Sequence, residues 1–197
     1  MSSRLILKQA LTENGRKTST VVTEEAYGGK FLPAFFLEEV KLGDELDRGQ
    51  LPLRMTLFPP VKAEFKQEYA QLLRKYIKPM DPFMATVGKP NTFGSSEKPV
   101  RVLEIEYNQR LIALQRKIVS VLQYLPHNTQ FRAKFNAHVS IEKDDSRLET
   151  GDQIEIAGFS LVEMAPSTDH WKVIGKIGLK GSEMRTDGKI IKMINRD

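Results

Sequence analysis

Two apolar stripes with the period of an α-helix most constrain what this chain can fold into. In both segments apolar residues recur every three or four positions, and a proline follows each stripe. The first stripe predicts a helix over about 62–78, and the second predicts a helix between its N-cap Asn108 and Pro126. Strand-like segments surround both helices. They are expected at 30–40, 51–58, 83–87, 100–107, 135–141, 153–164 and 171–179, with shorter ones at 19–23 and 189–194.

The order of these elements favours a mixed α+β fold with antiparallel sheets. No glycine-rich phosphate loop opens either helix, which argues against a nucleotide-binding parallel sheet. The segment Gly88–Pro99 contains two prolines, an asparagine and two glycines and is predicted to be a loop, as is the acidic stretch Glu38–Arg48. We expect an N-terminal extension over 1–27, one domain with two lobes over 28–181, and a C-terminal tail over 182–197.

Composition excludes several kinds of protein. The 197 residues include no cysteine, so disulfides, thiolate metal sites and a cysteine nucleophile are excluded. Three histidines argue against a histidine-only zinc site, and the acidic pair Asp144–Asp145 lacks recognisable ligand spacing, so no metal or cofactor is expected. No apolar run approaches the roughly 20 residues of a membrane span, and no signal-peptide core follows the N-terminus. We expect a cytoplasmic protein without a membrane partner.

The charge is mildly basic and unevenly distributed. Thirty Lys and Arg against 25 Asp and Glu give a formal net charge of +5. Residues 62–101 hold eight bases and four acids, and residues 172–197 hold seven bases and three acids. These regions could bind a polyanion such as RNA, or they could be a solubilising surface.

Two short strand motifs carry residues suited to phosphate chemistry. Arg54-Met55-Thr56 and His138-Val139-Ser140 each place a basic side chain and a hydroxyl two positions apart. Because side chains alternate along a strand, the members of each pair share a face. A cation beside a hydroxyl donor can hold a phosphate, and an imidazole can also transfer a proton near neutral pH.

In these motifs the chain resembles the two-histidine (2H) phosphoesterase superfamily, which includes the bacterial 2'-5' RNA ligase and cyclic phosphodiesterase group. That family carries two His-x-Thr/Ser motifs, one on a central strand of each of two pseudo-symmetric lobes. The resemblance covers about residues 30–180. It implies a bilobal fold with two antiparallel sheets, flanked by helices, around a central groove. It further implies that His138 is catalytic and that Arg54, Thr56 and Ser140 bind the substrate phosphate.

The first motif departs from the family pattern because Arg54 occupies the histidine position. In the implied mechanism one histidine acts as general base and the other as general acid on a 2',3'-cyclic phosphate. An arginine does not exchange protons usefully near neutral pH, although its charge can stabilise a phosphorane. We therefore expect a protein that binds, and could hydrolyse, RNA or nucleotide phosphodiesters with 2',3'-cyclic or 2'-5' linkages. The alternative is a catalytically impaired nucleotide- or RNA-binding module of the same fold.

Other interpretations of single residues stay open. His138 could be a structural histidine, and Arg54 could pair with Glu104 or Glu106. A third function, protein interaction through residues 1–27, rests on that extension alone. The remaining candidates are secondary: Phe93, Tyr27 and Trp171 could stack a base; Lys62, Lys89 and Lys98 could extend a phosphate track; His170 could stack a base but fits surface better; and His127-Asn128-Thr129 fits a loop coincidence.

Overall fold

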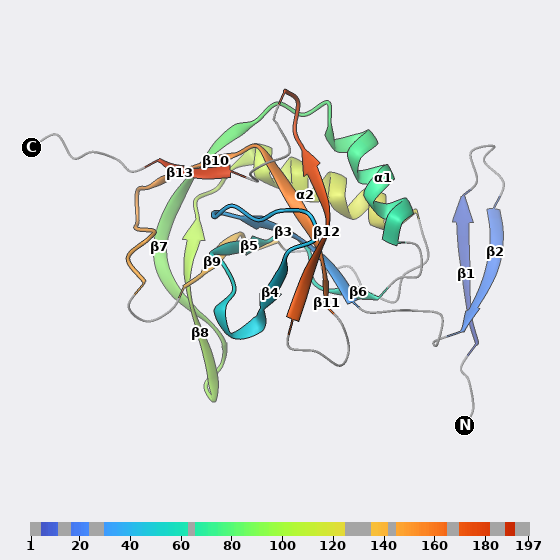
Figure 1. Cartoon of the computed structure of the whole chain (residues 1–197), viewed down its shortest axis with the longest axis horizontal. Helices are drawn as coiled ribbons and strands as arrows, with labels where there is room; N and C mark the ends of the chain where they lie inside the picture. Colours follow the sequence, from blue (N-terminus) through green and yellow to red (C-terminus); the bar gives the residue numbers. More distant parts are fainter. Residues whose placement is uncertain are drawn as a thin grey trace, which may run out of the picture.

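The chain folds into a large antiparallel sheet with two helices on one side, as the computed structural model shows (Figure 1). The structure describes residues 5–11, 17–23, 30–62, 66–124, 135–141, 145–164, 170–181 and 188–191. The predicted α+β class is confirmed. Within the described residues, no helix is both long and apolar enough to cross a bilayer.

Eleven strands form the large sheet, and every pairing in it is antiparallel. The strands are β3 (Lys30–Phe36), β4 (Glu45–Asp47), β5 (Arg54–Thr56), β6 (Val61–Lys62), β7 (Phe83–Ser95), β8 (Lys98–Ile105), β9 (His138–Ser140), β10 (Gln153–Ile156), β11 (Gly158–Met164), β12 (His170–Gly178) and β13 (Gly188–Ile191). Their order is β13-β10-β7-β8-β9-β5-β3-β11-β12-β4, with β6 also paired to β3. The short strands β5 and β9 therefore join the halves expected as two sheets. A separate two-stranded sheet holds β1 (Leu5–Leu11) and β2 (Lys17–Thr23).

Both predicted helices are present. They are α1 (Lys66–Ile77) and α2 (Gln109–Leu122). Asn108 caps α2 as predicted, because its side-chain oxygen accepts the backbone N–H groups of Arg110 and Leu111, both at 3.0 Å. The buried Tyr69 hydroxyl of α1 donates to the Leu122 carbonyl of α2 at 3.2 Å, which fixes one helix against the other.

Apolar side chains pack on both faces of the sheet, but the two hydrophobic clusters differ in size. The larger core lies between the sheet and the helices and includes Phe31, Phe35 and Met55 with the apolar stripes of α1 and α2. A smaller cluster holds alternate residues of β3, β11 and β12 together with Val40. Its members are Leu32, Ala34, Phe36, Val40, Val162, Trp171 and Val173. Because strand residues alternate between faces, this smaller cluster covers the side of the sheet opposite the helices.

The loop prediction for Gly88–Pro99 is wrong. β7 runs on to Ser95 and forms a long hairpin with β8, in which Phe93 pairs with Val100. A register shift between Val87 and Pro90 accommodates the proline without a ladder hydrogen bond. Gly94 then adopts a φ of +95°, a conformation that glycine allows, at the end of the hairpin.

Three further expectations need correction. The acidic stretch Glu38–Arg48 is not wholly a loop, since it contributes β4 at the sheet edge and is followed by a 3-10 helix, Arg48–Gln50. The segment 153–164 is two strands, because β10 pairs with β7 whereas β11 pairs with β3. The sequence pattern also missed β1, which lies within the expected N-terminal extension.

Candidate functional site

The register of β5 and β9 places all four motif side chains on one face of the sheet. Met55 is opposite Val139 in this antiparallel pair, and both side chains are fully buried in the larger core. The alternation along each strand turns Arg54, Thr56, His138 and Ser140 to the other side, where all four are half-buried. We call the surface formed by these four residues the site face.

His138 is held in a defined orientation on the site face. Its Nδ1 lies 2.8 Å from the backbone carbonyl oxygen of Asn136. A carbonyl only accepts, so Nδ1 carries the proton, and in the neutral ring Nε2 keeps its lone pair. The imidazole makes a T-shaped contact with the Phe93 ring, with centroids 4.8 Å apart and planes at 78°. These contacts leave Nε2 as the atom that can take up or return a proton.

Arg54 is positioned by an aromatic ring and has hydrogen-bonding capacity to spare. Its guanidinium carbon lies 4.9 Å from the centroid of the Trp171 ring, within range of a cation–π contact. Its Nε is buried and has no hydrogen-bond partner within the described part of the chain. Burial lowers the pKa of Arg54 by desolvation, although a guanidinium starts so high that it stays charged near neutral pH. The structure thus presents a permanent cation with an unpaired donor.

The structure does not show the pairing of Arg54 with Glu104 that the sequence left open. Glu104 lies opposite His138 in the β8–β9 ladder and accepts a hydrogen bond of 2.6 Å from the Asn91 side chain. Among the described residues, no carboxylate forms an ion pair with Arg54. The hydroxyls of Thr56 and Ser140 also have no side-chain partner in this part of the chain, so both can donate to a ligand.

The secondary candidates differ in where they lie. Phe93 belongs to strand β7 rather than to a loop, and it contacts His138. Trp171 is 8% exposed, so it supports Arg54 and is not an open stacking platform. Lys89 and Lys98 are exposed on the β7–β8 hairpin, and His170 is exposed at the start of β12. Lys62 lies in β6, opposite Lys30 of β3. Tyr27 and His127 lie outside the described residues.

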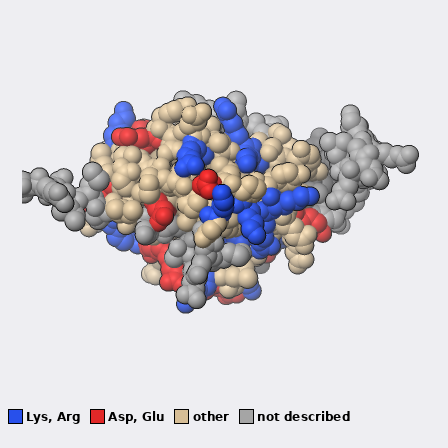
Figure 2. Space-filling model, turned by 90° about the horizontal axis from the view of Figure 1, so that it is seen from above, with Lys and Arg blue, Asp and Glu red and all other residues tan. Residues whose placement is uncertain are grey.

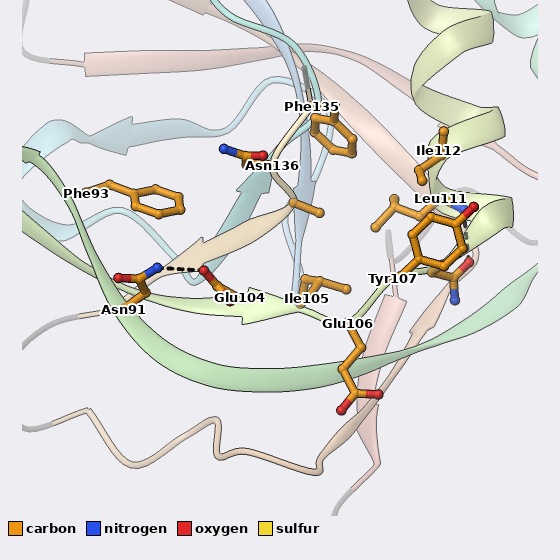
Figure 3. A pocket seen from close by; sticks show the side chains of 12 residues that line it. Asn91, Phe93, Glu104, Ile105, Glu106, Tyr107, Leu111, Ile112, Phe135 and Asn136 are labelled. Carbon is orange, nitrogen blue, oxygen red and sulfur yellow. Dashed lines mark hydrogen bonds between the residues drawn. The ribbon is translucent and has the colours of Figure 1, made fainter.

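The sequence did not predict the hydrogen bonds that three residues form at or beside His138. They are Asn136, whose carbonyl fixes the histidine tautomer, and the pair Asn91 and Glu104. Asn136 carries no side-chain signal because its contribution comes from the backbone. A cavity of about 410 Å³ adjoins this region and is lined by Asn91, Phe93, Glu104 and residues of 105–112 and 135–137 (Figure 3).

Positive charge gathers over the helices. Figure 2 shows the side of the molecule that is uppermost in Figure 1, where Lys and Arg outnumber Asp and Glu. The helices carry six bases and one acid: Lys66, Glu68, Arg74 and Lys75 on α1, and Arg110, Arg116 and Lys117 on α2. Among the described residues, no group of three histidines or carboxylates could hold a metal ion.

Comparison with solved structures identifies the fold. TT0787 of Thermus thermophilus superposes with a TM-score of 0.53 at 17% identity, over 78% of this chain and 100% of that chain. E. coli LigT complexed with 3'-AMP gives a TM-score of 0.54 at 16% identity, over 78% of this chain and 99% of that one. E. coli LigT complexed with phosphate gives 0.52 at 15% identity, with the same two coverages. The chain therefore has the LigT-like α+β fold of the 2H phosphoesterases.

The sequence itself supplies the family. Residues 34–162 match the profile of the 2'-5' RNA ligase superfamily, and this match includes both strand motifs. The chain belongs to the 2'-5' RNA ligase superfamily, which confirms the resemblance to the 2H phosphoesterases. A search of characterised protein sequences gave no significant match.

Proposed function

We propose that this protein binds RNA or nucleotide phosphodiesters on the site face, at 2',3'-cyclic ends or 2'-5' linkages. The observation that carries the proposal is the placement of Arg54, Thr56, His138 and Ser140 together on one face of adjacent strands. Membership of the 2'-5' RNA ligase superfamily supports it. The structures of E. coli LigT with phosphate and with 3'-AMP, which share this fold, support a nucleotide phosphate as the ligand class.

Each of the four side chains has a role in phosphate binding that its chemistry allows. Arg54 supplies permanent charge, and the N–H groups at the end of its guanidinium can donate to phosphate oxygens. Thr56 lies opposite His138 and Ser140 lies opposite Arg54 when the Met55–Val139 register is extended. The two hydroxyls therefore alternate with the two basic groups around the same point and can donate to the remaining oxygens.

His138 is the proton-transfer group in this proposal. When water attacks the phosphorus of a 2',3'-cyclic phosphate, the bond to the 2'-oxygen breaks, water loses a proton and the 2'-oxygen gains one. The lone pair on Nε2 of His138 can take the proton from water. Arg54 cannot protonate the departing oxygen at a useful rate, so solvent must supply that proton. We expect turnover to be about 100- to 10,000-fold below that of a site with both proton-transfer groups.

A second candidate is a binding module without turnover. The observation that favours it is Arg54 itself, which strengthens phosphate binding at the position where the family mechanism needs a titrating group. Binding is common to both candidates. Turnover of a 2',3'-cyclic nucleotide separates them.

Calorimetric titration with inorganic phosphate and with 3'-AMP tests the shared claim. We expect the parent protein to bind both, and Arg54→Gln to weaken both by about tenfold or more, since it removes a charged hydrogen-bond donor. Lys41→Gln is the matched control, because it removes an exposed cation that belongs neither to the site face nor to the candidate phosphate track. A parent protein that binds neither ligand, or an Arg54→Gln variant that binds as well as the parent, would contradict the proposal.

Hydrolysis is then measured on 2',3'-cyclic AMP. If the protein is an enzyme, slow turnover is present in the parent and is lost in His138→Ala, which still binds phosphate through Arg54. If phosphate binds and no turnover is detected above the buffer rate, the binding module is the correct function.

A further inference from the structure

The cavity beside His138 contains none of the four site-face residues and is unused by the proposed function. It has a volume of about 410 Å³, which lies within the range of small-ligand pockets. It lies between the end of β8, the first turn of α2 and the residues that precede β9. Two of its lining residues adjoin His138 directly: Phe93 makes a T-shaped ring contact with the imidazole, and Glu104 is its cross-strand neighbour.

The lining of the cavity suits a flat ring better than a phosphate. Figure 3 shows Phe93 and Asn136 at one end, Tyr107 and Leu111 at the other, and Phe135 and Ile112 along the wall. The described lining residues include no lysine or arginine, whereas two of them, Glu104 and Glu106, are carboxylates. An anionic group is therefore disfavoured here. Aromatic and aliphatic walls favour a planar, uncharged ring.

Glu104 is the fixed polar group of this cavity. The Asn91 side chain donates to its Oε1 at 2.6 Å, and the Asn91 oxygen is itself fixed by the Thr92 N–H at 2.7 Å. The other carboxylate oxygen of Glu104, and the second lone pair of Oε1, remain available to a ligand. By contrast, the Asn108 side chain is engaged at both ends, since its oxygen caps α2 and its nitrogen donates to the Met84 carbonyl at 2.7 Å. The cavity therefore offers a pre-positioned group that only accepts hydrogen bonds.

Among the four RNA bases, only guanine presents two adjacent donors on one edge, at N1 and N2. Adenine and cytosine place an acceptor beside their amino group, and uracil has one N–H between two carbonyls. A carboxylate repels those acceptor atoms, whereas it can accept two charge-assisted hydrogen bonds from the guanine edge.

We propose that this cavity is a base-binding subsite that selects guanine, with the Glu104 carboxylate accepting hydrogens from N1 and N2 of the base. The inference rests on the proposed function, because it takes the phosphate of the same nucleotide to lie on the site face beside His138. Phe93 connects the two places, since it contacts His138 and lines the cavity. The substrate class narrows to nucleotides or RNA ends in which guanosine lies next to the phosphate.

The test compares the affinities of 3'-GMP, 3'-AMP and 3'-UMP by calorimetry. We expect the parent protein to prefer 3'-GMP by about tenfold or more, the range of a good bidentate contact to a base. Glu104→Gln should remove this preference while leaving the affinity for 3'-AMP unchanged within about twofold. Glu106→Gln is the matched control: it neutralises an exposed carboxylate of the same cavity that Asn91 does not hold. That variant should keep the guanine preference. Thermal unfolding checks that both variants fold.

Three outcomes would overturn the subsite while the proposed function stands. They are equal affinity for all three nucleotides in the parent, a guanine preference that persists in Glu104→Gln, and an equal loss of affinity for all three nucleotides in that variant. The last result would mean that Glu104 acts on His138. If inorganic phosphate and all three nucleotides fail to bind, the proposed function fails, and titration with guanosine decides the subsite separately. Guanosine binding that Glu104→Gln abolishes supports the subsite, and its absence overturns it.

Discussion

Replacing Arg54 with histidine should convert a site with one proton-transfer group into a site with two. Met55 is opposite Val139, so position 54 is opposite Ser140 and diagonal to His138 across the β5–β9 pair. Diagonal cross-strand neighbours are about 7–8 Å apart. Two imidazoles at that separation, both on the site face, can approach one phosphate from opposite sides. Arg54→His therefore places a titrating group where the 2H mechanism needs it.

The size of the gain follows from the surroundings of position 54. A positioned general acid or base contributes about 100- to 10,000-fold. His138 has its Nδ1 fixed by the Asn136 carbonyl at 2.8 Å, whereas position 54 offers packing against Trp171. A new imidazole at position 54 would therefore be held less firmly in one orientation than the imidazole of His138. We therefore expect a gain near the lower limit, about 100-fold in the rate of 2',3'-cyclic AMP hydrolysis.

The assay measures initial rates against pH for the parent, Arg54→His and Arg54→Gln. The parent should follow the ionisation of one group, since arginine does not titrate in this range, whereas Arg54→His should give a bell-shaped profile. Arg54→Gln also removes the arginine charge but adds no titrating group, so its hydrolysis rate should not rise. His138→Ala should abolish the activity of both the parent and Arg54→His. The reasoning is refuted if Arg54→His gains nothing and hydrolysis survives the loss of His138.

Three further predictions test the structure around the site. Met55→Ala should destabilise the fold by about 2–5 kcal/mol in urea unfolding, because it empties a fully buried position beneath the site face; a change below the error of the measurement would contradict that packing. A side-chain hydrogen bond from Arg147 lowers the pKa of Asp145, so this carboxylate stabilises the protein above its unfolded pKa and less as pH falls through its folded pKa. Asp145→Asn should thus cost at most about 1 kcal/mol at pH 7 and less at acidic pH, as Asp145 becomes protonated, and an equal loss at neutral and acidic pH would exclude the charge as the cause. If the basic surface over α1 and α2 holds RNA, the affinity for a short RNA oligomer should fall steeply as the salt concentration rises. An affinity that does not change with salt would show that the charge only aids solubility.

Local sequence patterns were enough to predict the helices and the faces of the motif strands. The helical stripes and the Asn108 cap depend on neighbours three or four positions away, so they can be read from the chain itself. The same holds for Met55 and Val139, which alternate with the site residues. The resemblance to the 2H phosphoesterases then supplied the pairing of two motifs that no local pattern could have brought together.

The parts that sequence reasoning missed depend on contacts between distant segments. The outer part of the β7–β8 hairpin, Gly88–Pro99, is predicted to be a loop because Pro90 and Gly94 are usual turn residues, yet a register shift and a positive φ let the strand contain both. The stacking of Arg54 on Trp171 and the hold of Asn91 on Glu104 require the tertiary fold. The Asn136 contact uses a backbone carbonyl, which every residue possesses, so it leaves no trace in the sequence.

The pairing of β5 with β9 also has a consequence for how the protein folds. Met55 and Val139 lie far apart along the chain, and β5 and β9 have three residues each, so few local interactions can form this pair in advance. The chain between β5 and β9 forms a long loop, and closing it costs conformational entropy. The pairing is therefore unfavourable until the elements on either side are in place. We therefore expect the site face to assemble late in folding, after the β7–β8 hairpin and the helices. Phosphate binding would then report on completion of the native state, and neither half of the chain would bind phosphate on its own.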